Sequence, residues 1–72
     1  MKEPQHFSMK EMLKLKKAMR IFIGNTGIVQ EYLSREQLTQ LESEVLICFA
    51  GFPTFNRVST LKIAEQILEL VN

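Results

Sequence analysis

Residues 38–71 read LTQLESEVLICFAGFPTFNRVSTLKIAEQILELV, and this stretch decides the fold. In its first part, apolar side chains recur at alternating steps of three and four residues, the spacing of one helix face: Leu38, Leu41, Val45 and Cys48, widened by Leu46, Ile47 and Phe49. The second part carries a similar seam with flanking apolar positions: Leu61, Ala64, Leu68 and Val71, flanked by Ile63, Ile67 and Leu70. The stretch therefore predicts two helices that pack as an antiparallel hairpin.

A short linker, GFPTFN at positions 51–56, separates the two apolar segments. Gly51 can adopt the positive φ that follows many helix ends, and Pro53 cannot continue a helix because it lacks a backbone N–H. We expect Phe52 and Phe55 to close the end of the core, because two exposed aromatic rings in a short turn are hard to keep soluble.

Capping residues mark three helix starts: Ser8 with Glu11, Ser34 with Gln37, and Asn56 or Ser59. The first helix is expected over residues 9–23. Its apolar side chains fall on one side: Met12, Leu15, Met19, Phe22 and Ile23. Gly24 and Gly27 are expected to supply the left-handed conformations that end this helix. Residues 28–33 are too short to distinguish a helix from a strand by pattern, and we expect a connecting turn or a short helix.

From its 72 residues we expect one domain at most, with a flexible tail over 1–7 and a single helical domain over 8–72. A core of this size contributes only a few kcal/mol. Cys48 is the sole cysteine, so no intramolecular disulfide can form, and no cluster of residues has metal-ligand spacing. Association with a second subunit is the remaining source of stability. We therefore expect an all-α homodimer with three principal helices, in which the hairpin packs against its counterpart.

The longest apolar run, residues 45–52, is far shorter than the ~20 residues of a transmembrane helix. The polar N-terminus has no apolar signal core. Both observations predict a soluble, cytoplasmic protein without a membrane span.

The net charge of +1 conceals an asymmetry, because residues 1–23 carry six bases and two acids whereas residues 24–72 carry three bases and six acids. Five of the bases gather in one expected helix: Lys10, Lys14, Lys16, Lys17 and Arg20. This basic side could bind a phosphate backbone or an anionic membrane surface, face an acidic protein or only keep the helix soluble. Recognition of a DNA sequence through its base pairs is not expected, because the last helix offers few suitable side chains among its acidic residues.

No set of residues resembles a catalytic, cofactor or metal site. His6 stands alone in the tail, and Cys48 is expected to be a small buried hydrophobe with a raised pKa. The remaining carboxylates of interest are expected on solvated helix faces: Glu42, Glu44, Glu65 and Glu69. Residues 24–27 lack the strand and the Lys-Ser/Thr pair of a phosphate loop. We therefore expect no enzymatic activity and no cofactor.

The order of features from Ala18 onward is similar to that of a known family. These features run in chain order: Ala18 and Phe22 before the turn at 24–27; Leu38, Leu41 and Val45 in an acidic helix; Gly51; a polar turn with Asn56, Arg57 and Ser59; and a last helix with Leu61, Ile63 and Leu68. In this order the chain resembles the small AriR-like regulators of biofilm formation and acid resistance, described as two-component-system connectors. The resemblance covers about two thirds of the chain.

The resemblance implies an all-helical homodimer that regulates through protein contacts, with weak DNA association and no catalytic residues. The chain departs from the family pattern in two places. Its segment between Gly27 and Val45 is longer, and its turn at residues 52–55 is more apolar.

The function that best fits these observations is a small regulatory adaptor that binds a transcription or signalling protein. Its docking residues are expected at Phe52 and Phe55 or on the basic helix side: Lys10, Lys14, Lys17 and Arg20. Two alternatives stay open, namely a nucleic-acid-associated regulator that uses this basic side and a small phage- or plasmid-type inhibitor of a host protein.

Overall fold

The computed structural model describes residues 3–71, and within them the chain is all-helical. Its four helices are α1 (Met9–Gly24), α2 (Thr26–Tyr32), α3 (Arg35–Phe49) and α4 (Arg57–Glu69). The all-α prediction is confirmed. The three principal helices are α1, α3 and α4, and the ambiguous segment 28–33 forms most of the short helix α2, which brings the number of helices to four.

Both capping boxes that the sequence predicts are present. The Ser8 hydroxyl accepts from the Glu11 backbone N–H at 3.2 Å, and the Glu11 carboxylate accepts from the Ser8 N–H at 2.8 Å. Ser34 and Gln37 make the same pair of contacts at the start of α3. Asn56 occupies the N-cap position of α4, but its side chain makes no capping hydrogen bond.

The glycines behave differently from one another. Gly51 has φ +87°, as the sequence predicts for the residue that follows the end of a helix. The expectation of left-handed conformations at Gly24 and Gly27 is wrong, because both lie in helices and neither has a positive φ. Asn25 alone separates α1 from α2, with φ −138° and ψ 46°, so the direction of the chain changes without a left-handed residue.

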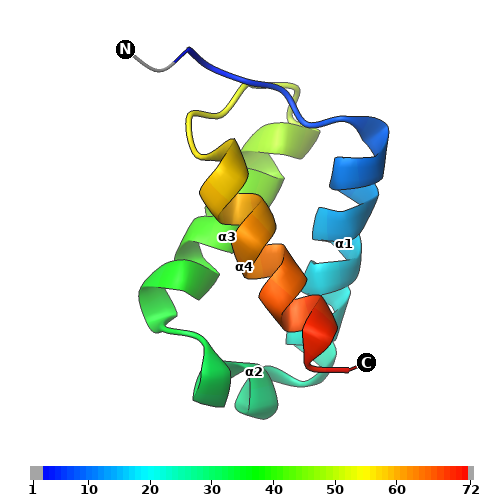
Figure 1. The fold of residues 1–72 in the computed structure, drawn as a ribbon, viewed down its shortest axis with the longest axis vertical. Coiled ribbons are helices and arrows are strands. Elements are labelled where there is room, and N and C mark those ends of the chain that lie inside the picture. Colours follow the sequence, from blue (N-terminus) through cyan, green and yellow to red (C-terminus); the bar gives the residue numbers. More distant parts are fainter. Residues whose placement is uncertain (1–2, 72) are drawn as a thin grey trace.

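The helices α1 and α3 lie beside each other in opposite directions, α4 crosses in front of them, and α2 closes the end opposite the α3–α4 loop (Figure 1). The predicted hairpin of α3 and α4 is present as a contact between antiparallel helices. The contact of α4 with α1 is nevertheless the more extensive one. The core therefore sits between α4 and the α1–α3 pair.

Eleven apolar residues are buried and form one core: Leu15, Ala18, Phe22, Val29, Leu33, Leu38, Leu41, Cys48, Ile63, Ala64 and Ile67. The buried side of α4 is turned from the predicted seam toward Thr60, Ile63 and Ile67, since this helix packs against two neighbours at once. Leu61 and Leu68 are only half-buried, and Val71 is exposed.

Several side chains assigned to the core from sequence lie at the surface. Ile23 is 73% exposed, because one residue beyond the buried Phe22 the helix has turned by about 100°. Leu46, Ile47 and Phe49, expected to widen the buried stripe of α3, are also exposed. The reason is that only one side of α3 is covered by other helices.

The expected tail makes two defined contacts in its described part, residues 3–7. Gln5 pairs with Thr54 in an isolated antiparallel bridge, with N···O distances of 2.7 and 2.8 Å. Phe7 packs against the core. Met1 and Lys2 lie outside the described residues.

Candidate protein-binding surfaces

The α3–α4 loop presents apolar side chains to solvent. Phe52 is 65% exposed, Phe55 is 58% exposed, and Val58 in the first turn of α4 is 58% exposed. We call these three residues the loop patch. The expectation that Phe52 and Phe55 close the core is wrong, because other residues of the loop, above all Thr54, point inward in their place.

A buried carboxylate holds this loop. Glu44 on α3 is only 6% exposed; it accepts a hydrogen bond from the Thr54 hydroxyl and another from the Asn56 side-chain amide at 3.2 Å. The Thr54 hydroxyl also accepts from the Asn56 backbone N–H at 3.0 Å. The backbone of Thr54 is fixed from the other side by Gln5. The contacts of Glu44, Thr54 and Asn56 therefore anchor the loop, while the rings of Phe52 and Phe55 stay exposed to solvent.

The sequence-based expectation that Glu44 lies on a solvated face is wrong. Glu44 lies three residues after Leu41 and four before Cys48, so it is on the apolar face of α3, where it meets the start of α4. The signal that could have found it is a carboxylate on an apolar face followed by the hydroxyl and amide of Thr54 and Asn56, which can satisfy it.

An open depression of about 350 Å³ adjoins the loop patch. Phe55 and Val58 supply its apolar part, Arg57 and Lys62 supply positive charge, and Glu3 supplies a negative charge. A depression with this lining can accept an apolar side chain that is flanked by a carboxylate. Lys62 is exposed and well placed to meet such a carboxylate.

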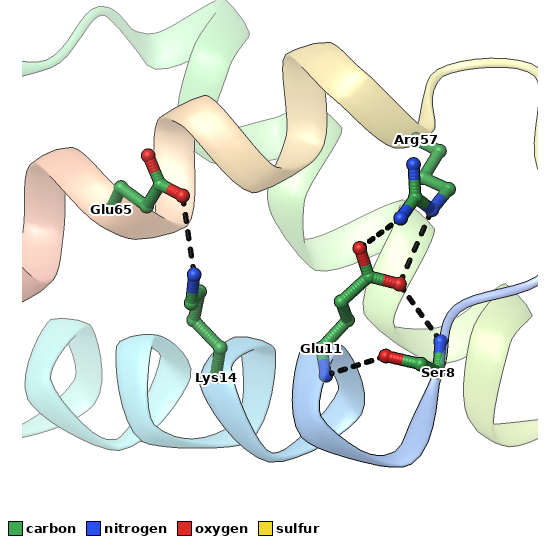
Figure 2. Close-up of polar contacts among 5 residues, drawn as sticks. All are labelled: Ser8, Glu11, Lys14, Arg57 and Glu65. Atoms are coloured by element: carbon green, nitrogen blue, oxygen red, sulfur yellow. Dashed lines mark hydrogen bonds and ion pairs between the residues drawn. The ribbon is translucent and has the colours of Figure 1, made fainter.

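Two ion pairs fasten α1 to α4 (Figure 2). Arg57 donates from Nε to the Glu11 carboxylate at 3.2 Å and from a second nitrogen to its other oxygen. The hydrogen bond from the Ser8 backbone lowers the pKa of Glu11 most; desolvation opposes it, and the contacts with the Ser8 hydroxyl and Arg57 lower it further. Lys14 pairs with Glu65 at 3.1 Å, with both side chains partly exposed.

The bases of α1 do not form a single free stripe. Lys14 is half-buried and turned toward Glu65 on α4, so this candidate residue contributes to the α1–α4 contact. The other candidates on this helix, Lys10, Lys17 and Arg20, are exposed, as is Lys16. No exposed residue of α1 is acidic.

A second apolar area lies on the side of the α1–α3 pair that faces away from α4. On α1, Glu11 and Lys14 turn toward α4. On α3, Gln40 does the same, and it donates to the Ser59 hydroxyl at 2.6 Å. The opposite sides of the two helices carry the set that we call the open face: Met9, Leu13, Lys16, Arg20 and Ile23 on α1, and Arg35, Thr39, Glu42, Leu46 and Phe49 on α3.

The open face exposes large apolar side chains on both helices, with 75% exposure at Met9, 59% at Leu13, 73% at Leu46 and 52% at Phe49. Sequence reasoning missed it, because the pattern assigned Leu46 and Phe49 to the core. The sequence signal that could have found this face is the C-terminal half of α3, which is apolar nearly all round. Such a helix is either buried on all sides or carries a second contact surface.

The reactive residue types do not assemble into a site within the described part of the chain. Cys48 is buried, and desolvation, followed by the nearby charge of Glu44, raises the pKa of its thiol. His6 is exposed. Among residues 3–71 no group of three or more His, Cys, Asp or Glu side chains could hold a metal ion. No described helix is long and apolar enough to cross a membrane.

No known protein family, curated protein or solved structure matches this chain significantly. The resemblance to the AriR-like regulators therefore stays a prediction, and any function proposed for the chain rests on its own residues.

Proposed function

We propose that this chain is a small, non-enzymatic regulatory adaptor that binds a transcription or signalling protein through the loop patch. The observation that carries the proposal is the exposure of Phe52 and Phe55 on a loop anchored by Glu44, Thr54 and Asn56. Aromatic side chains are the groups that most often dominate the energy of protein interfaces. Because the loop is already ordered, binding does not have to supply the free energy of ordering it.

The lining of the depression specifies the chemistry of the partner. Phe55 and Val58 favour an apolar side chain, and Lys62 favours a carboxylate beside it. The partner segment is therefore one with an apolar anchor and a carboxylate next to it. In this proposal the protein acts in the cytoplasm as a homodimer.

The test is affinity capture from nuclease-treated extract of the native host with three baits: the unchanged chain, a Phe52→Ser/Phe55→Ser variant and an Ile28→Ser control. Ile28 is 52% exposed on α2, away from the loop, so the control removes a similar apolar side chain elsewhere. The proposal expects one protein to be retained by the unchanged chain and the control and lost by the double variant. Equal retention by all three baits contradicts it.

The identity of the captured protein separates an adaptor from a phage- or plasmid-type inhibitor. A transcription or signalling protein supports the adaptor, whereas a host enzyme whose activity falls on binding supports the inhibitor. Both use the same contact chemistry, so the surface variants alone do not separate them.

A nucleic-acid-associated regulator is the second candidate, favoured by the exposed bases of α1 without an exposed acid among them. Binding to phosphates must weaken steeply as salt rises. It must also fall when Lys10, Lys17 and Arg20 become glutamine, while Lys62→Gln serves as the control outside α1. Salt-insensitive binding to duplex DNA, or an equal loss in the control, contradicts this candidate.

A further inference from the structure

The chain as a whole exposes more surface than a compact monomer of this size. The chain has an accessible surface of 5250 Å² for 8.4 kDa. Monomeric proteins of that mass average about 4600 Å². The excess is on the scale of the ~800 Å² that each partner contributes to a stable protein interface.

The open face has an apolar end and a charged middle. Met9 and Leu13 begin α1 at the end where Leu46 and Phe49 finish α3, because the two helices run in opposite directions (Figure 1). Lys16 lies at the middle of α1, and Glu42 lies at the middle of α3.

Two helix pairs can meet face to face around a two-fold axis in two ways. In one arrangement α1 lies on the partner's α1 and α3 on the partner's α3, which places Lys16 against its own copy and Glu42 against its own copy. In the other arrangement α1 lies antiparallel on the partner's α3. This second arrangement pairs Lys16 with Glu42 twice and stacks the apolar ends of both copies, so like charges do not meet at the middle of the face.

We infer that the open face binds a second copy of this chain, with α1 of each protomer antiparallel to α3 of the other. The face is self-complementary, because it carries a basic helix and an acidic helix whose apolar ends lie at the same level. The inference rests on the homodimer of the proposed function and names the face that forms it. The loop patch takes no part in this contact, so failure of the dimer test does not alter the capture of a partner by the loop patch.

The test is sedimentation equilibrium over a range from low to high micromolar protein, with K16E, E42K and their equimolar mixture. Each charge reversal alone replaces two intersubunit attractions by two repulsions, and we expect the dimer to weaken by at least about tenfold. The K62E chain is the control, since Lys62 is exposed on α4 outside the open face. It must dimerise as the unchanged chain does.

The mixture separates a contact between subunits from one within a subunit. A heterodimer of the K16E chain and the E42K chain pairs opposite charges at both positions. A homodimer of either variant pairs like charges at both positions. Recovery of dimer in the mixture supports the inference. A monomer at every concentration, no recovery in the mixture, or equal weakening in K62E overturns it. Helical circular dichroism of each variant shows that it is folded.

Discussion

Both sides of the α1–α3 pair carry large apolar side chains, but their surroundings are very different. The side toward α4 buries Leu15 and Leu41 completely and is joined to α4 by the Glu11–Arg57 pair. The other side exposes Leu13 and Leu46. Apolar content alone therefore does not determine which side of a helix becomes core. The covered side stabilises the fold, whereas the uncovered side is available for contact.

The largest expected difference between the two sides is the cost of removing a leucine. Leu41→Ala, at a fully buried position, is expected to lower the free energy of unfolding by about 2–5 kcal/mol, because it leaves a cavity. Leu46→Ala, on the same helix but 73% exposed, is expected to change it by less than about 0.5 kcal/mol. Urea denaturation of dilute, monomeric protein measures both values. Equal costs would mean that the open face is covered within the monomer.

A smaller effect is expected from the carboxylate that anchors the loop. Glu44→Ala leaves the Thr54 hydroxyl and the Asn56 amide without their acceptor, and we expect a loss of about 1–3 kcal/mol in the free energy of unfolding. Glu42→Ala, which removes an exposed carboxylate from the same helix, is the matched control, with an expected change below about 0.5 kcal/mol in dilute, monomeric protein. If both variants lose the same stability, Glu44 does not hold the loop through these hydrogen bonds.

Glu11 contributes a pH-dependent stabilisation on the covered side. Its pKa is lowered in the folded chain, so its contribution is complete above the usual range of a glutamate and is lost as the pH falls through the lowered pKa. Glu11→Gln keeps a side chain that can complete the capping box but removes the charge. Denaturation at a series of pH values should show the variant less stable near neutrality and level with the unchanged chain in strong acid. A difference that is constant with pH would contradict this assignment.

The smallest effect is expected at Lys14 and Glu65. Both side chains are partly exposed, at 39% and 53%, and exposed ion pairs contribute only about 0–1 kcal/mol. Lys14→Gln should therefore change the free energy of unfolding by a few tenths of a kcal/mol, and less in high salt. A loss of unfolding free energy as large as that of Glu44→Ala would contradict this, and would show that the pair is a main stabilising contact between α1 and α4.

Local sequence signals predicted the secondary structure well. The capping boxes at Ser8 and Ser34 and the glycine at position 51 depend on neighbouring residues only, and all three are found in the structure. The orientation of α4 and the burial of Glu44 depend on contacts with residues far along the chain. Helical periodicity gives the direction of an apolar stripe but not its partner, so the sequence could not distinguish a buried stripe from an uncovered one.

The candidate surfaces were only partly predictable for the same reason. Phe52 and Phe55 were identified as candidate contact residues, but their exposure was not expected, since Thr54 is the loop residue that fills the end of the core. The basic residues were identified by composition. Only the structure places Lys14 toward Glu65 and leaves Lys10, Lys17 and Arg20 exposed.

Amide NMR spectra recorded while the protein is diluted from millimolar to micromolar concentration test whether the uncovered side of the α1–α3 pair is the surface of contact. The expected result is a concentration-dependent shift of the signals of Leu13, Lys16, Glu42 and Leu46, with constant signals at Phe55 and at Lys62 on α4. Shifts confined to Phe55 and Lys62, or spectra that do not change with concentration, would contradict it.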